Sequence, residues 1–277
     1  MNRLSLYIRQ SLQSIYSPQE LKSLTRTICC DLLGVDAIDF FLGKDIHLSE
    51  NKQKELETIL KRLRNNEPIQ YIRGYADFFG LMFSVAPGVL IPRPETEELV
   101  DLIIKENAGA LRILDIGTGS GCIAITLAKK IPLATVSAWD ISEEALAIAR
   151  QNNSQLGTSV SFCREDIFDV IAKTEFYDII VSNPPYITSL EKEEMDANVL
   201  DWEPELALFV PDDDPLYFYR SIGRFGMESL PLGGKIYFEI NQAYGDKVSF
   251  LLKTIGYRDI CVIKDLFGKD RIIKACK

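Results

Sequence analysis

The apolar residues at the start of the chain are spaced as they are in helices. Leu4, Ile8 and Leu12 recur at every fourth position, which predicts an amphipathic helix with one inward face. Ser17 is followed by a proline and, three positions on, by a glutamate, a capping box that opens a second helix. This helical pattern continues, so we predict a small domain of helices only over residues 1–72.

The pattern changes after this helical segment. Aromatic and β-favouring residues surround Gly80 over the stretch 75–85, which predicts a β-hairpin. A loop with three prolines follows and leads into a helix that includes residues 99–104. We expect residues 73–93 to form a β-hairpin linker and residues 94–277 to form a second domain.

In the second domain, apolar runs of strand length alternate with helical segments. The runs cover residues 113–116, 135–139, 160–163, 177–181 and 235–240. This alternation predicts βαβ units, which form a mostly parallel sheet with helices on both faces. Two further runs, 257–264 and 271–276, are joined tightly across Gly268 with no helix between them. The predicted fold class is therefore α/β, with an antiparallel strand at the end of the sheet.

Composition and charge narrow the class of protein. The 277 residues are 47% hydrophobic and 26% charged, which is ordinary for a globular protein with a sizeable core. No apolar run approaches the ~20 residues that cross a bilayer, so we expect a cytoplasmic protein with no membrane partner. The formal charge of -9 argues against binding long nucleic acid through its phosphates.

Cysteine and histidine offer little catalytic chemistry. The six cysteines include no C-x-x-C pair, and the single histidine is His47. This pattern predicts neither a disulfide framework nor a metal site. It also leaves few ways to build a Ser-His or Cys-His nucleophile, and we expect His47 to be a surface residue.

A glycine loop follows the first run of the second domain. Gly117, Gly119 and Gly121 alternate with Thr118 and Ser120 between a predicted strand and a predicted helix. Glycine lets the backbone turn sharply and approach a ligand closely, and ligands of open α/β sheets bind beyond the carboxyl ends of strands. The dinucleotide fingerprint Gly-x-Gly-x-x-Gly would require its third glycine at position 122, where this chain has Cys122. This difference weakens an NAD interpretation. The alternative is a glycine turn in a protein that binds nothing.

Acidic residues end the next two strands. Asp140 stands where a carboxylate can accept two hydrogen bonds from a ribose diol, which favours a nucleoside ligand. Asp166 offers an acceptor for an adenine amino group, and Phe168 offers a wall for the ring. The alternative is that these acids only cap helices in an α/β protein that binds no ligand, and it stays most open for Asp166.

The residues Asn183, Pro184, Pro185 and Tyr186 follow the fourth strand of the parallel sheet. The Asn183 carbonyl and the Pro184 carbonyl can accept both hydrogens of a planar NH₂ group and so direct its lone pair toward a methyl donor. Tyr186 offers a flat surface for an amide or a base. An ordinary Asn-Pro turn is the alternative, but its place beside the glycine loop favours methyl transfer.

Motifs along the whole chain resemble one family, the peptide chain release factor glutamine methyltransferases. The motifs are residues 68–71, 90–97, 115–121, 183–186, 203–204 and 265–271. Asn-Pro-Pro-Tyr is shared with DNA and RNA amino-methyltransferases, whereas Pro-Arg-Pro-Glu-Thr-Glu in the linker is much more particular. The resemblance implies a class I methyltransferase sheet of seven strands in residues 94–277. It also implies S-adenosylmethionine as donor, S-adenosylhomocysteine as product, and the glutamine of the Gly-Gly-Gln loop of release factors as substrate.

The resemblance also assigns roles to residues. It implies that the loop 117–121, Asp140 and Asn183 contact the cofactor, and that residues 183–186 contact the glutamine. The linker near Pro94 and Thr96 would close over the methionine end. Pro94 and the acidic residues after it can equally open a helix, and both interpretations are compatible.

Two rival functions remain open at the level of sequence. A nucleic-acid amino-methyltransferase would present adenine or guanine NH₂ to the same Asn183 and Tyr186. A non-catalytic adapter would keep the fold and use the helical domain to bind proteins. The acidic charge speaks against the first rival, and the intact glycine loop against the second. The chain departs from the family that it resembles just before Glu203 and Pro204. Many members of that family carry an apolar or basic residue there, whereas this chain has Asp201 and Trp202.

Overall fold

The computed structural model describes residues 2–170 and 176–277, which form two compact units. The first unit comprises the described residues up to Gly74 together with the segment Asp196–Trp202. The second unit runs from Tyr75 to Met195 and from Glu203 to Lys277. The predicted hairpin is present as β1 (Tyr75–Phe78) and β2 (Leu81–Ser84), and its contacts group it with the second unit.

The first unit consists of helices around one apolar core. They are α1 (Arg3–Leu12), α2 (Pro18–Arg26) with its π-helical continuation η1 (Thr27–Leu32), α3 (Ala37–Phe41), α4 (Glu50–Arg64), α5 (Ile69–Arg73) and α9 (Ala197–Trp202). Leu4, Ile8 and Leu12 of α1 are buried in one cluster with Leu60 of α4. The amphipathic first helix and the capping box at Ser17 are both confirmed. The unit is helical throughout its described elements.

Helix α9 belongs to the first unit although it lies far along the chain. The indole Nε1 of Trp202 donates a hydrogen bond of 3.0 Å to the backbone carbonyl of Asn65, the residue at the end of α4. An indole N–H needs such an acceptor when the ring packs against protein. Trp202 therefore ties a distant segment of the chain to the helical unit.

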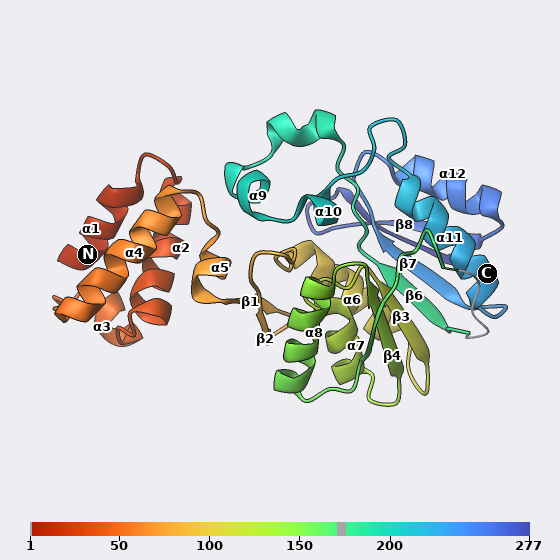
Figure 1. The fold of residues 1–277 in the computed structure, drawn as a ribbon, viewed down its shortest axis with the longest axis horizontal. Helices are drawn as coiled ribbons and strands as arrows, with labels where there is room; N and C mark the ends of the chain where they lie inside the picture. The colour runs from red at the N-terminus through yellow and green to blue at the C-terminus, as the bar shows by residue number, and fades with distance from the viewer. Residues whose placement is uncertain (1, 171–175) are drawn as a thin grey trace. The chain divides into compact units, whose positions relative to one another are not determined.

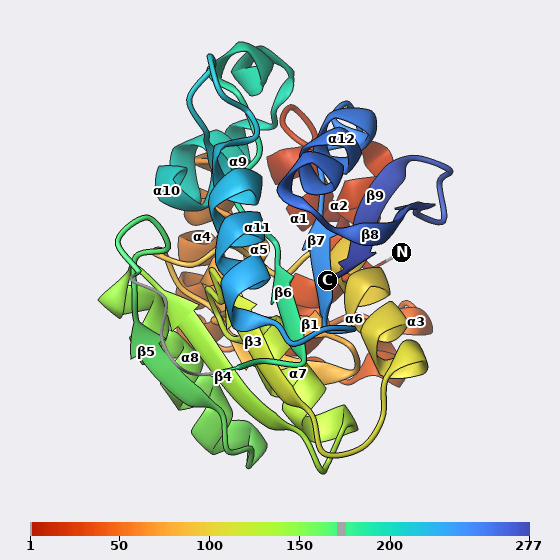
Figure 2. The same ribbon diagram turned by 90° about the vertical axis from the view of Figure 1, so that its right-hand side faces the viewer.

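A seven-stranded sheet forms the centre of the second unit. The strands are β3 (Arg112–Ile116), β4 (Thr135–Asp140), β5 (Ser161–Arg164), β6 (Ile179–Ser182), β7 (Lys235–Glu239), β8 (Arg258–Lys264) and β9 (Asp270–Cys276). Figure 2 shows them in the order β5-β4-β3-β6-β7-β9-β8. Neighbours from β5 to β7 are parallel, whereas β9 is antiparallel to both β7 and β8. The parallel sheet and the antiparallel last strand are confirmed, but β8 and not β9 forms the edge.

Helices cover both faces of this sheet, as the alternating pattern predicts (Figure 1). The helices on the faces are α6 (Pro94–Glu106), α7 (Cys122–Lys130), α8 (Glu143–Leu156), α11 (Tyr217–Ser229) and α12 (Gly245–Ile255). The 3₁₀ turn η2 (Ser189–Glu194) and the short helix α10 (Glu205–Leu208) belong to the segment between β6 and α11. On one face, Leu99 of α6 and Ile123 of α7 share a buried cluster with Phe83 of the hairpin. On the other face, Ile222 of α11 and Leu252 of α12 are buried together. No described helix is both long and apolar enough to span a bilayer.

The parallel pairing brings the candidate site together. Strands β3, β4 and β6 are neighbours in the sheet and point the same way, so their carboxyl ends meet at one edge. The glycine loop follows β3, Asp140 ends β4, and Asn183 follows β6. These three features therefore lie at the edge where ligands of open α/β sheets bind.

Candidate active site

A cavity of about 340 Å³ lies at the carboxyl edge of β3, β4 and β6. This volume falls in the range of ~300–1,000 Å³ that small-molecule sites occupy. Of the residues predicted from the sequence to bind the cofactor or the acceptor, those that line it are Gly117, Gly119, Asp140, Asp166, Phe168, Asn183, Pro184 and Pro185. The other predicted residues, Thr118, Ser120, Gly121 and Tyr186, are not among the described residues that line the cavity. All of these residues belong to the second unit.

The glycine loop makes its turn with three left-handed residues. The backbone φ is +76° at Gly117, +55° at Gly119 and +82° at Gly121, a region that side-chain-bearing residues rarely adopt. The N–H groups of Gly117 and Thr118 donate hydrogen bonds of 2.9 and 3.0 Å to the carbonyl oxygen of Trp139. The loop is thereby fixed to the end of β4, with its backbone bordering the cavity.

The other three residues of the loop have structural contacts. The hydroxyl of Thr118 donates to Oδ2 of Asp115 at 2.6 Å, and the Ser120 carbonyl accepts from the amide of Asn152 at 2.9 Å. A Cβ at Gly121 would lie within 3.2 Å of a side chain of α8, so glycine also permits close packing of α7 and α8. Contact between these three residues and a ligand stays a prediction.

Asp140 presents its carboxylate beside the glycine loop. Its Oδ2 accepts a hydrogen bond of 2.8 Å from the N–H of Gly119, and its Oδ1 accepts one of 2.9 Å from the N–H of Ser142. Each carboxylate oxygen has a further lone pair for a ligand hydroxyl. Burial raises the pKa of Asp140 above its ordinary value, and the backbone hydrogen bonds counteract this rise. Two hydroxyl donors from a diol would stabilise the charged form further.

Asp166 and Phe168 form a short turn after β5. The Oδ1 of Asp166 accepts a hydrogen bond of 3.0 Å from the N–H of Phe168, as in an Asx turn. The ring of Phe168 stacks on Tyr217, with centroids 4.2 Å apart. Asp166 therefore has a structural role in a turn and not as a helix cap. Both residues also line the cavity, so ligand contact stays a prediction that is compatible with this turn.

The Asn-Pro-Pro-Tyr loop contributes differently at its two ends. Asn183 lines the cavity, and its Nδ2 donates a hydrogen bond of 3.3 Å to Oγ1 of Thr96. Because the NH₂ end of the amide faces Thr96, the carbonyl oxygen is the end available to another donor. The hydroxyl of Tyr186 instead donates to Oε1 of Glu239 at 3.2 Å. Burial raises the pKa of Tyr186, which keeps the phenol neutral.

The linker before α6 is held by a buried carboxylate. Oε1 of Glu203 lies 2.6 Å from the guanidinium of Arg93, and its Oε2 accepts from a backbone N–H of the linker at 3.1 Å. Pro94 begins α6 with acidic residues in its first turn, as predicted. Thr96 is only 3% exposed and donates its hydroxyl to Glu239. Closure of this linker over a ligand stays a prediction.

Several cavity residues were not predicted from the sequence. They include Val89 of the linker, Trp139 of β4, Leu206 of α10 and Phe218 of α11. An apolar residue buried in a core and one buried against a ligand follow the same pattern, so no separate signal marks these residues in the sequence. Glu239, the buried partner of Thr96, is not among these cavity residues. It did have a signal in the sequence, because an acidic residue at the end of an apolar strand is rarely buried without a partner.

The carboxyl of Asp115, directly before the glycine loop, is completely buried. Burial raises its pKa to about 7, whereas an aspartate in an unfolded chain has a pKa of ~3.9. The native state therefore holds the proton more tightly than the unfolded state. It follows that the free energy of unfolding falls as the pH rises from about 4 to about 7, and then levels off.

Asp115→Asn is expected to remove this pH-dependent loss of stability. Urea denaturation at about pH 5 and about pH 8 gives the free energy of unfolding of both proteins. Between these two values the wild type should lose on the order of 2–3 kcal/mol relative to the variant. The same pH dependence in both proteins would contradict the raised pKa.

The chain matches known methyltransferase families over both units. Residues 95–200 match the Methyltransferase small domain, and residues 5–74 match the PrmC N-terminal domain. A release factor glutamine methyltransferase of Bacteroides thetaiotaomicron is 67% identical over 99% of this chain and 99% of that protein. The chain belongs to the release factor glutamine methyltransferases. A relative with the same name from Flavobacterium psychrophilum is 45% identical and covers 96% of this chain and 95% of its own.

Solved structures share the fold of this release factor glutamine methyltransferase at low identity. A methyltransferase of Pyrococcus furiosus is 20% identical, with a TM-score of 0.54 over 83% of this chain and 99% of its own. The 16S rRNA N2 G1207 methyltransferase of Thermus thermophilus is 16% identical, with a TM-score of 0.54 over 73% of this chain and 49% of its own. The expected methyltransferase sheet with an N-terminal helical region is confirmed.

A release factor glutamine methyltransferase is an enzyme whose methyl donor is S-adenosylmethionine. The cavity fits that molecule in size and in chemistry. Asp140 offers carboxylate oxygens to a diol, and the backbone of Gly117 and Gly119 leaves room for close approach. Apolar residues such as Trp139 and Phe168 suit a flat ring.

Proposed function

We propose that this enzyme methylates the side-chain nitrogen of the glutamine in the Gly-Gly-Gln loop of peptide chain release factors. The observation that carries the proposal is the orientation of Asn183 at the cavity, with its NH₂ end held by Thr96. The carbonyl end is then free to accept a hydrogen bond from an amide NH₂. The names of the relatives, which share the sequence over nearly the whole chain, support glutamine as the acceptor.

Cofactor binding is proposed to use the acids and the glycine loop. Asp140 would accept hydrogen bonds from the two ribose hydroxyls, and Asp166 from the adenine amino group. Phe168 would form one wall of the adenine site. Gly117 and Gly119 would let the backbone approach the methionine portion. When bound, S-adenosylmethionine supplies a methyl group on a positively charged sulfur.

The acceptor amide is proposed to be held by two oxygens. The carbonyl oxygens of the Asn183 side chain and of Pro184 would each accept one hydrogen of the glutamine NH₂, which turns the nitrogen lone pair toward the methyl group. The prolines also lack N–H donors that could compete for these oxygens. Tyr186 would support the flat amide, as the sequence suggested.

The proposed transfer forms one bond and breaks one bond. The glutamine nitrogen bonds to the methyl carbon while the carbon–sulfur bond breaks, and S-adenosylhomocysteine leaves. The nitrogen gains positive charge in the transition state, so the two accepting oxygens interact with it more strongly than with the neutral amide. One proton of the nitrogen then passes to water, and no general base has to act before attack.

Among the described residues of the second unit, neither rival function is favoured by a feature of its own. A nucleic-acid substrate would favour a basic surface, whereas the chain carries a formal charge of -9. A non-catalytic adapter would have no need of an Asn183 amide oriented at the cavity. Because release factors act on ribosomes, we place the proposed activity in the cytoplasm.

The proposal is tested by transfer of a labelled methyl group from S-adenosylmethionine. The acceptors are purified release factor, the same factor with its loop glutamine changed to asparagine, DNA and RNA. Label is expected on the unmodified factor alone. Label on nucleic acid alone would move the enzyme to the rival class. Cofactor binding without any labelled product would favour the adapter.

A further inference from the structure

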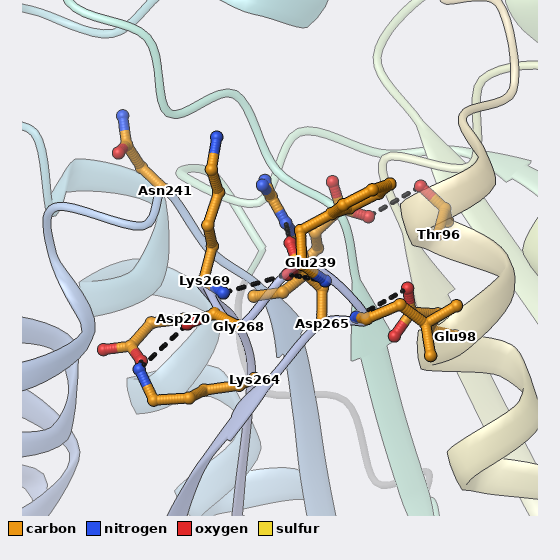
Figure 3. A network of polar contacts seen from close by, with 12 residues as sticks. Thr96, Glu98, Glu239, Asn241, Lys264, Asp265, Gly268, Lys269 and Asp270 are labelled. Carbon is orange, nitrogen blue, oxygen red and sulfur yellow. Dashed lines mark hydrogen bonds and ion pairs between the residues drawn. The ribbon is translucent and has the colours of Figure 1, made fainter.

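Glu239 is a buried carboxylate that has no part in the proposed transfer of the methyl group. It ends β7 and is 1% exposed, inside the second unit. A carboxylate that deep is costly unless donors surround it. Burial raises the pKa of Glu239, and three groups counteract this rise: the hydroxyls of Thr96 and Tyr186, which donate to the carboxylate, and the guanidinium of Arg271, which favours the charged form electrostatically. Figure 3 shows Thr96 and Glu239 of this network, joined by a dashed line.

Thr96 connects Glu239 to Asn183 by a chain of hydrogen bonds with a fixed direction. The Thr96 hydroxyl donates its single proton to Oε2 of Glu239 at 2.6 Å. Its oxygen can then only accept, and it accepts from Nδ2 of Asn183 at 3.3 Å. The carboxylate therefore decides which end of the Asn183 amide faces Thr96.

The second oxygen of the Glu239 carboxylate accepts a hydrogen bond from Tyr186. Its hydroxyl donates to Oε1 of Glu239 at 3.2 Å. Both ends of the Asn-Pro-Pro-Tyr loop, Asn183 and Tyr186, are thus connected to one side chain of the neighbouring strand. An ionised carboxylate is the side chain that can accept from both hydroxyls at once.

The charge of Glu239 is supported from β9. Arg271 attracts the negative charge of Glu239, and it is itself held by Oδ2 of Asp265 at 3.2 Å. Asp265 also accepts from the backbone N–H of Phe267 and Lys269, both at 2.9 Å. The turn between β8 and β9 thereby fixes the cation that compensates the buried carboxylate.

We infer that Glu239 is a positioning residue of this enzyme, which sets the orientation of the Asn183 amide through Thr96 and anchors Tyr186 directly. The inference rests on the proposed function, because it assigns the Asn183 carbonyl to the glutamine substrate. Without the carboxylate, the Thr96 hydroxyl is free to donate to the Asn183 carbonyl. The amide then turns its NH₂ end toward the substrate NH₂, and two donors face each other.

Two substitutions separate this role from simple packing. Glu239→Met removes both acceptors at similar volume, and Thr96→Val removes the hydroxyl at similar volume. Each is expected to lower kcat for release factor methylation by about tenfold or more, since misplacement of a reacting group can cost ~100-fold. The KM for release factor and the Kd for S-adenosylmethionine should change by less than about threefold, because the alignment of bound groups is what is lost. Thr96→Ser, which keeps the hydroxyl, should recover most of the rate lost in Thr96→Val.

The double variant tests whether Glu239 acts through Thr96. In the Thr96→Val background no hydroxyl remains to reverse the Asn183 amide. Adding Glu239→Met then removes only the direct contact with Tyr186, so it should lower kcat much less than it does in the wild type. Multiplied effects of the two substitutions would mean that Glu239 acts independently of Thr96, and would overturn the chain of hydrogen bonds.

Matched controls come from the same second unit. Glu106 of α6 also accepts a hydrogen bond from a tyrosine, the hydroxyl of Tyr237 at 3.0 Å, and Thr126 is a fully buried threonine of α7. Glu106→Met and Thr126→Val should leave kcat near the wild-type value. Thermal unfolding of all variants shows which of them are folded at the assay temperature.

The outcomes distinguish the inference from the function on which it rests. Transfer by the wild type together with near-normal kcat in folded Glu239→Met and Thr96→Val overturns the positioning role alone. Loss of kcat with a large rise in cofactor Kd would also overturn it, because the network would then serve the cofactor. A wild type that methylates no release factor would instead overturn the proposed function.

Discussion

Replacement of Asn183 by alanine is expected to lower methyl transfer to release factor by at least about 100-fold, comparable to the loss of one preorganised hydrogen-bonding group in other active sites. The variant lacks the carbonyl that accepts a hydrogen from the substrate NH₂. The Kd for S-adenosylmethionine should rise by only a few fold, because Asp140 and the glycine loop are unchanged. Single-turnover transfer and calorimetric binding measure the two quantities separately.

Asn107→Ala is a suitable control for this experiment. Asn107 follows α6, and its side chain also bonds to other side chains, among them Lys235 at 2.8 Å. Lys235 begins β7, so this contact lies at the edge of the sheet opposite to the cavity. The control should keep its transfer rate. Near-normal turnover in Asn183→Ala would mean that Asn183 does not align the acceptor.

Asp140→Ala is expected to act on the other substrate. The loss of hydrogen bonds between a carboxylate and two hydroxyls, worth ~1.5–3 kcal/mol, should raise the Kd for S-adenosylmethionine about 10- to 100-fold. The change also frees the N–H groups of Gly119 and Ser142, which adds to the loss by loosening the glycine loop. Isothermal titration calorimetry gives the Kd, and the transfer rate at saturating cofactor should fall much less.

The control for Asp140 is a carboxylate on the surface. Asp101 of α6 pairs with Lys105 one turn away at 2.5 Å, and both side chains are exposed. Such a pair contributes little to stability, so Asp101→Ala should leave the Kd for S-adenosylmethionine unchanged. An Asp140→Ala variant that binds S-adenosylmethionine as tightly as the wild type would place the ribose elsewhere.

The sheet was predictable because buried parallel strands carry a strong local signal. Runs such as 113–116 and 177–181 are apolar almost throughout, and β3 and β6 are found there with shifts of one or two residues. The place of the antiparallel strand was predicted less well. Its direction follows from the tight turn at Gly268, but whether β8 or β9 pairs with β7 depends on contacts between residues far apart in sequence.

The candidate site was predictable where strand ends determine it. Gly117, Asp140 and Asn183 follow or end neighbouring parallel strands, so topology alone brings them to one cavity. The roles of Thr118 and Tyr186 depend on where a side chain points. Thr118 turns to the buried Asp115 and Tyr186 turns to Glu239, and no local pattern encodes those partners.

Partners distant in sequence explain the remaining surprises. Thr96 and Glu239 are joined at 2.6 Å although they lie in different elements, a helix and a strand. Trp202 is tied to Asn65 of the helical unit, although the segments that flank Asp196–Trp202 in the sequence belong to the second unit. Hydrophobic periodicity reports which residues are buried, but it does not report which element they meet.

The most direct measurement is tandem mass spectrometry of release factor after incubation with the enzyme and S-adenosylmethionine. The account predicts one added methyl group, located on the side-chain nitrogen of the glutamine in the Gly-Gly-Gln loop, and its absence after incubation with Asn183→Ala. A methyl group on any other residue, or an unmodified factor beside an enzyme that binds its cofactor, would contradict it.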